Sequence, residues 1–219
     1  NDPMSGLCGV VSRDSCPEVL LFGTDYHSHL GSQLGGMAVK GARFEKKIHD
    51  ISQGSFKFRF GNDVTTMEGT MGIGVISDSD AQPLLIRSRL GLYALAMTGF
   101  IENKDELTAR LLRQGQVFTE SSQAGVNGVE VLARIIESGR DLVEGIASVY
   151  DHIEGAASLL LLTEDGILAA RDLLGRTPLV IGERGEDYMV ASESIALMNL
   201  GFRPVKELGP GEIVRIGPG

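Results

Sequence analysis

Cys8 is the residue of this sequence whose side chain is best suited to nucleophilic chemistry. It stands in the short apolar run LCGVV at positions 7–11. A thiol becomes a competent nucleophile when its pKa is lowered or a base lies beside it, and no histidine has a spacing that identifies such a base. A nucleophile at the extreme N-terminus can instead use its own α-amine, of pKa near ~8. Cys8 gains that base only if everything before it is removed, and otherwise a buried, inert thiol is expected.

Asp25, His27 and His29 form a second candidate, because their D-x-H-x-H spacing could present one carboxylate and two imidazoles to a metal ion. The pattern resembles the opening motif of metal-dependent hydrolases. Such sites need further ligands, and the remaining histidines are His49 and His152. We therefore predict no metal site and expect hydrogen-bonded histidines on a helix face, with a metal-dependent hydrolase kept as a distant alternative.

Two glycine clusters, at 31–36 and 69–74, invite comparison with phosphate-binding loops. The dinucleotide fingerprint needs G-x-G-x-x-G between a strand and a helix, and the P-loop needs Gly-Lys-Ser/Thr. Neither cluster has that order, and neither carries the lysine. Close packing or positive φ angles are the better explanation for these glycines.

Composition excludes several classes of protein. The chain has 219 residues, 42% of them hydrophobic, and a formal net charge of -9, so it can bury a core as one domain or at most two. The negative charge argues against a nucleic-acid or anionic membrane surface, and no apolar run reaches the roughly 20 residues of a membrane span. Two cysteines, Cys8 and Cys16, are too few for a disulfide scaffold, so we expect a cytoplasmic protein.

The elements that must position these residues follow from hydrophobic patterning. Short apolar segments predict strands at 7–11, 72–76, 92–97, 158–162, 167–170, 179–181, 188–191 and 212–216. Apolar residues at helical spacing predict a middle layer of helices, with a further helix within 19–30, and 44–68 has the composition of a long surface excursion or hairpin. Strands before and after a helical block favour an α+β fold with two mainly antiparallel sheets.

Several motifs spread along the chain then indicate a family. In order they are CGVV at 8–11, His29-Leu30-Gly31 with Gly36, Gly72-Ile73-Gly74, Ala81-Gln82-Pro83, Met97-Thr98-Gly99-Phe100-Ile101, Arg171-Asp172 through Gly175-Arg176-Thr177-Pro178-Leu179, Ala191-Ser192-Glu193-Ser194 and Gly209-Pro210-Gly211-Glu212. Each motif alone is weak, but in this order they are specific. The sequence resembles the class II, N-terminal-nucleophile glutamine amidotransferase domain of amidophosphoribosyltransferases, over residues 8–219.

The resemblance implies a four-layer αββα fold in which an N-terminal cysteine, here Cys8, attacks the side-chain amide of glutamine. Thr98 and the backbone N–H of Gly99 fall where the family stabilises the oxyanion of the tetrahedral intermediate. Ammonia would pass to a C-terminal phosphoribosyltransferase domain and a phosphoribosyl acceptor in purine biosynthesis. The resemblance also implies a homo-oligomer and no cofactor.

The sequence departs from the family where glutamine is held. Ser77 and Asp78 stand where the family has the arginine that binds the substrate carboxylate and the tyrosine after it, and Gly128 stands where it has the acid that binds the ammonium. Thr98 replaces the oxyanion-hole asparagine, a kind of donor worth about 3 kcal/mol. Two alternatives follow: a non-catalytic regulatory or docking domain, or hydrolysis of an amide that lacks an α-carboxylate.

The ends of the sequence carry two further expectations. Met4 inside the opening NDPM indicates that residues 1–3 come from an expression vector, so that 1–7 comprises vector residues and a leader preceding Cys8. The apolar stretch at 212–216 ends in a strand-like pattern close to Gly219, which indicates a fragment of a longer protein.

Overall fold

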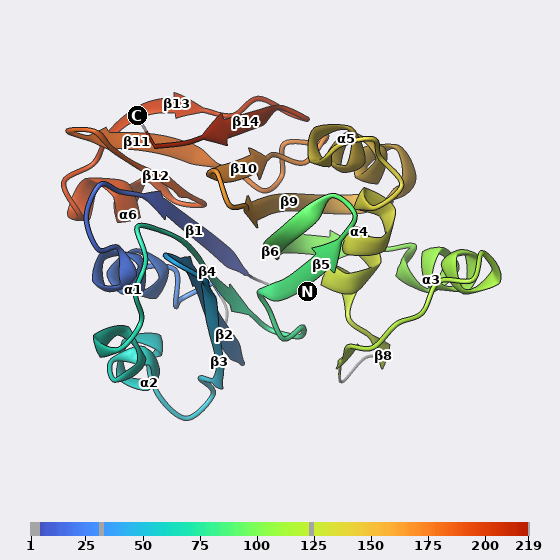
Figure 1. The fold of residues 1–219 in the computed structure, drawn as a ribbon, viewed down its shortest axis with the longest axis horizontal. Coiled ribbons are helices and arrows are strands. Elements are labelled where there is room, and N and C mark those ends of the chain that lie inside the picture. The colour runs from blue at the N-terminus through green and yellow to red at the C-terminus, as the bar shows by residue number, and fades with distance from the viewer. Residues whose placement is uncertain (1–4, 31–32, 123–124, 219) are drawn as a thin grey trace.

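The computed structural model describes residues 5–30, 33–122 and 125–218 of the chain. Two β-sheets lie face to face, and helices cover the outer face of each (Figure 1). Residues 1–4 of the expected leader and Gly31 of the first glycine cluster lie outside the described residues. No helix of the described part is long and apolar enough to cross a membrane.

The first sheet has seven strands, and strand β1 lies at its centre. Its neighbouring strands pair antiparallel. In spatial order the strands are β13 (Arg203–Glu207), β11 (Val180–Arg184), β12 (Asp187–Ala191), β1 (Gly6–Val11), β4 (Met71–Ser77), β2 (Leu34–Lys40) and β3 (Phe44–Asp50). β1 is buried along its whole length because layers cover both of its faces.

The second sheet has five strands, also antiparallel. Their order is β14 (Ile213–Ile216), β10 (Ile167–Ala170), β9 (Gly155–Leu162), β6 (Gly91–Ile101) and β5 (Leu84–Ser88). A small separate pair joins β7 (Ser121–Ser122) to β8 (Gly125–Val126). The central strand β9 reads GAASLLLL, an almost unbroken apolar run, as expected for a strand with no exposed face.

The helices form the two outer layers. The first sheet carries α1 (Pro17–Asp25), α2 (Phe56–Phe60) and α6 (Ser194–Asn199), with a short 3-10 helix, η1 (Asp63–Thr65), beside them. The second sheet carries α3 (Lys104–Arg113), α4 (Gly128–Ile136) and α5 (Leu142–His152). Asn127 caps α4 and Asp141 caps α5, each through its side chain, which explains why both helices begin where they do.

Three buried clusters fill the spaces between the four layers. Leu7 and Ile73 of the first sheet meet Leu160 of the second in the cluster between the sheets. A second cluster joins the first sheet to α1, α2 and α6, and a third joins the second sheet to α3, α4 and α5. The predicted α+β, four-layer αββα arrangement with two antiparallel sheets is thereby confirmed.

The segment 44–68 is more ordered than its composition indicates. Phe44–Asp50 is strand β3, which pairs with β2 along its full length at the edge of the first sheet. Only half-buried and exposed side chains occur on β3, so apolar patterning could not reveal it. The remainder of the segment contains α2 and η1. The expectation of a long surface excursion or hairpin therefore holds for β3, which forms a hairpin with β2, but it did not include the helices that follow.

Close packing explains the glycine clusters, as predicted. A Cβ atom on Gly36 would lie 1.8 Å from the carbonyl oxygen of Gln82. A Cβ atom on Gly74 would lie 2.0 Å from the hydroxyl oxygen of Thr24. Both contacts are far shorter than van der Waals separation, so β2 and β4 can approach their neighbours only where the side chain is absent.

Candidate active site

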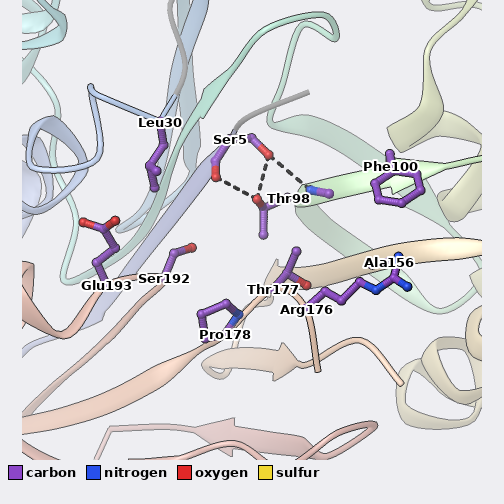
Figure 2. A pocket seen from close by; sticks show the side chains of 11 residues that line it. Ser5, Leu30, Thr98, Phe100, Ala156, Arg176, Thr177, Pro178, Ser192 and Glu193 are labelled. Carbon is purple, nitrogen blue, oxygen red and sulfur yellow. Dashed lines mark hydrogen bonds between the residues drawn. The ribbon is translucent and has the colours of Figure 1, made fainter. Parts of the chain in front are cut away.

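A cavity of about 280 Å³ opens where the two sheets meet, next to the start of β1. Its walls come from β6, β9, the loop after β10 and the loop between β12 and α6 (Figure 2). The lining residues are Ser5, Leu30, Thr98, Gly99, Phe100, Ala156, Arg176, Thr177, Pro178, Ser192 and Glu193. This volume is near the lower end of small-molecule binding sites.

Thr98 and Gly99 both form hydrogen bonds with Ser5 at the edge of this cavity. The backbone N–H of Gly99 donates to the Ser5 hydroxyl oxygen at 3.2 Å. The Thr98 hydroxyl lies 2.6 Å from the same oxygen and donates to the Ser5 carbonyl at 2.8 Å. Figure 2 shows all three contacts. A backbone N–H and a hydroxyl around one oxygen are groups of the kind that stabilise an oxyanion.

Glycine is required at position 99. Its φ angle is +110°, and a Cβ atom there would lie 1.8 Å from the carbonyl oxygen of Ala156. A side chain would force β6 away from β9, and it would turn the Gly99 N–H away from the cavity. The two predicted residues, adjacent on β6, both line the cavity.

Ser5 belongs to this site, and the sequence interpretation did not include it. Successive strand residues point to opposite faces, so Ser5 shares a face with Leu7, which lies in the layer between the sheets. The start of β1 is fixed there by Ser192, whose hydroxyl accepts the Leu7 N–H at 2.9 Å and whose own N–H donates to the Leu7 carbonyl at 3.0 Å. Alternation along residues 5–11 was the signal that could have identified Ser5.

Cys8 lies on the other face of β1, among the residues packed against α1. Its side chain is fully buried, and a Cβ atom on Gly23 would lie 2.6 Å from its sulfur. Burial raises the pKa of the Cys8 thiol to about 12, opposed by a hydrogen bond with Thr24 and reinforced by Cys16. Cys8 does not line the cavity, so its surroundings give no support to the prediction that it is the nucleophile.

The positions predicted to hold the substrate also lie outside the cavity lining. Ser77 is buried at the end of β4, where its hydroxyl accepts the Ser79 N–H at 3.3 Å. Asp78, half-buried, follows it directly. Gly128 begins α4 and donates its N–H to the Asp80 carboxylate at 3.2 Å. Ser77, Asp78 and Gly128 thus do not line the cavity that Thr98 and Gly99 line.

Asp80 places a carboxylate beside Gly128, the position at which the resemblance leads us to expect an acid. A Cβ atom on Gly128 would lie 3.0 Å from Asp80 Oδ2. A side chain at position 128 would therefore crowd the Asp80 carboxylate. Burial raises the pKa of Asp80, while Lys104 and the Gly128 N–H act in the opposite direction. No spacing rule connects residues 80 and 128, so sequence reasoning could not have paired them.

The motif containing Asp25, His27 and His29 is engaged by protein groups. His27 Nδ1 donates to the Gly23 carbonyl at 2.8 Å, and Nε2 accepts the Glu193 N–H at 3.2 Å. Burial lowers the pKa of His27, which keeps the ring neutral in this arrangement. Asp25 accepts the Lys57 N–H at 3.0 Å. Within the part of the chain that the structure describes, no His, Cys, Asp and Glu side chains group as metal ligands.

His29 nevertheless reaches the cavity indirectly. Its Nε2 lies 3.1 Å from the carboxylate of Glu193, which lines the cavity wall. Figure 2 shows Glu193 at one end of the cavity and Arg176 at the other. Both are motif residues of the sequence. The described lining therefore carries one acidic side chain and one basic side chain.

Asp172 shapes the wall that Arg176 and Thr177 provide. Its carboxylate accepts the backbone N–H groups of Arg176 at 3.0 Å and Thr177 at 2.8 Å, and the Thr177 hydroxyl at 2.5 Å. Burial works against ionisation, but these hydrogen bonds outweigh it and lower the pKa of Asp172. The Asp172 carboxylate contacts the backbone of Arg176, so it holds the loop in place.

Known proteins share this architecture. The structure matches the glutamine phosphoribosylpyrophosphate amidotransferase of B. subtilis, solved with ADP and GMP, with a TM-score of 0.86 and 29% sequence identity, over 97% of this chain and 47% of that chain. A structure described as the allosteric regulatory enzyme of purine biosynthesis matches with a TM-score of 0.87 and 28% identity, again over 97% of this chain and 47% of that chain.

The sequence comparisons agree. The amidophosphoribosyltransferase of Methanocaldococcus jannaschii is 31% identical over 99% of this chain and 48% of its own length, and that of Bacillus subtilis is 31% identical over 96% and 45%. The chain thus spans about half the length of these relatives. The family model described as "Glutamine amidotransferase domain" matches residues 70–199, more than half of the chain. The chain belongs to the glutamine amidotransferase domain family, as its motifs predicted.

Proposed function

We propose that this chain is a glutaminase domain that hydrolyses the side-chain amide of glutamine, or of a closely related compound, in the cavity beside Ser5. The observation that carries the proposal is that the Gly99 N–H and the Thr98 hydroxyl both lie within hydrogen-bond distance of the Ser5 hydroxyl oxygen beside the cavity. The names and double length of the relatives support the further proposal that the ammonia passes to a phosphoribosyl acceptor, on a second domain, in purine biosynthesis.

The two donors are suited to the step that limits amide hydrolysis. Attack on the carboxamide carbon places negative charge on its oxygen, and donors fixed in advance stabilise that charge without reorganising. Gly99 cannot move its N–H, because β6 and β9 fix the backbone at this point. Thr98 is almost fully buried, so little water competes for its hydroxyl.

The charged lining supports an amino-acid substrate. Arg176 could pair with an α-carboxylate, and Glu193 could pair with an α-ammonium group. These two side chains would take over the roles for which Ser77 and Gly128 are unsuited. Glutamine carries both charges, whereas a simple primary amide carries neither.

A non-catalytic docking or regulatory domain is the second candidate. The observations that favour it are the absence of a guanidinium at Ser77 and of a carboxylate at Gly128. A domain of this kind would keep the four layers and the cavity but bind no glutamine. A non-catalytic domain would also not require the fixed geometry of Thr98 and Gly99.

An ammonia-release assay on glutamine separates the two. We expect turnover by the folded protein, reduced by roughly 10- to 1000-fold in Thr98→Val, which removes one oxyanion donor. The matched control is Thr66→Val, because Thr66 is exposed and its hydroxyl bonds only locally, to the Asp63 carbonyl. Absence of turnover in folded protein, both with residues 1–4 retained and with them removed as verified by mass, would replace the glutaminase with the docking domain.

A further inference from the structure

We propose that Ser5, carrying a free α-amino group, is the nucleophile of this cavity. The proposal rests on the glutaminase function proposed above and names the residue that performs its first step. It assigns the attack to a hydroxyl three residues before the thiol that the motif CGVV indicates.

The faces of β1 separate the two candidate nucleophiles. A Cβ atom on Gly6 would meet the side chain of His27, in the helical layer, whereas one on Gly9 would meet Val190 and Leu160, between the sheets. Odd-numbered residues therefore face the space between the sheets, and even-numbered residues face the helices. Ser5 accordingly faces the second sheet and its cavity, and Cys8 faces α1.

The surroundings of the Ser5 hydroxyl suit nucleophilic attack. Thr98 donates its single hydroxyl proton to the Ser5 carbonyl oxygen, so the Ser5 hydroxyl donates to Thr98 Oγ1 and accepts the Gly99 N–H. The Ser5 hydroxyl oxygen therefore lies beside the Gly99 N–H, which donates to it, and beside the Thr98 hydroxyl, which accepts from it. A carboxamide that approaches this oxygen brings its own carbonyl oxygen within reach of the same donors.

The missing base is the nitrogen of Ser5 itself. As a peptide nitrogen it has no useful basicity, but as a free α-amine it has a pKa of roughly 7.7–8.0 and can accept the hydroxyl proton. Cutting the bond between Met4 and Ser5 produces that amine. Serine has a small side chain, and initiator methionine is removed from new chains when the next residue is small.

The reaction is balanced in two steps. Ser5 Oγ forms a bond to the carboxamide carbon as its proton moves to the α-amine, the C–N bond breaks, and the amine returns the proton to the departing ammonia. The Ser5 ester remains. Water then attacks the ester carbon, giving one proton to the amine, and the C–O bond breaks to release the carboxylic acid and restore the Ser5 hydroxyl.

Chains that begin at Ser5 test the proposal against chains that retain residues 1–4, with each N-terminus verified by mass. We expect ammonia release from glutamine only when Ser5 is the first residue. The rate of ammonia release should fall at least ~1000-fold in Ser5→Ala, whereas Ser5→Cys should retain activity. The rate of ammonia release by folded Cys8→Ala should stay within about threefold of the parent rate. Ser28→Ala is the matched hydroxyl control, because Ser28 is exposed.

The pH profile and an acylation experiment add readouts that a structural role would not move. Turnover by the Ser5 chain should fall as pH drops below the α-amine pKa of roughly 8. p-Nitrophenyl acetate should leave an acetyl group on residue 5 of that chain and none on Ser5→Ala. Activity that survives in Ser5→Ala, activity that requires Cys8, or equal activity in chains that retain residues 1–4 would overturn the proposal.

The same experiments distinguish failure of the proposal from failure of the proposed function. Ammonia release that depends on Cys8 would leave the glutaminase in place and remove Ser5. Acetylation of Ser5 without ammonia release from glutamine would support Ser5 and remove glutamine as substrate. Neither ammonia release nor acetylation would overturn both.

Discussion

At the scale of single residues, Gly99 is a position where the structure leaves no room for a side chain. Gly99→Ala combines a φ of +110° with a clash against the Ala156 carbonyl, so we expect a loss of more than ~3 kcal/mol in the free energy of unfolding. Gly91→Ala is the matched control, because Gly91 lies on the same strand at φ +105° with open space around it. Its cost should be about 1–2 kcal/mol. Denaturant unfolding measures both, and equal losses would contradict the clash.

Cys8 gives the second prediction at this scale. A pKa of about 12 leaves on the order of one thiol in 10,000 ionised at pH 8, and full burial blocks access to it. We therefore expect Cys8 of the native Cys16→Ser variant to resist iodoacetamide and to react fully in guanidinium chloride. Mass spectrometry measures the modification. Alkylation of the native protein as fast as free cysteine would show that the thiol is accessible and activated.

At the scale of elements, the loop after β10 is built around Asp172. Asp172→Asn keeps the shape but removes the charge from three hydrogen bonds, so we expect a loss of about 1.5–3 kcal/mol in unfolding free energy, with reduced turnover because the loop lines the cavity. The control is Asp165→Asn, since the Asp165 side chain is 83% exposed in its ion pair with Arg215. That change should cost less than ~1 kcal/mol. Equal losses would contradict the proposed role.

The pH dependence of the Asp172 contribution has a definite sign. The folded pKa lies below that of the unfolded chain, so the unfolded state binds more protons in acid. The stabilisation is complete above the unfolded carboxyl pKa of about 3.9 and is lost as pH falls through the folded pKa. The difference in stability between the parent and Asp172→Asn should therefore shrink below pH ~4.

At the scale of the whole molecule, sequence patterns predicted the layers better than the site. Unbroken apolar runs such as β9 and stripes such as that of α4 identify buried elements directly. Edge strand β3 was missed because exposed side chains carry no such pattern. Thr98 and Gly99 were found through their motif. Ser5 was not, because its significance depends on which face of β1 meets the second sheet, a fact of packing that no local motif contains.

The site draws residues from both sheets, so its geometry depends on the spacing between them. Leu160 and Leu161 are adjacent on β9 and fully buried, but Leu160 packs between the sheets and Leu161 packs against the helices. Replacing either by Phe should cost about 1–3 kcal/mol through overpacking. Only Leu160→Phe presses the sheets apart, moving Thr98 and Gly99 away from Ser5, and a 1 Å displacement can cost ~100-fold in rate.

Steady-state kinetics at matched stability should show a loss of at least ~10-fold in kcat/KM for Leu160→Phe and little change for Leu161→Phe. Equal kinetic losses would mean that the spacing between the sheets does not control the site.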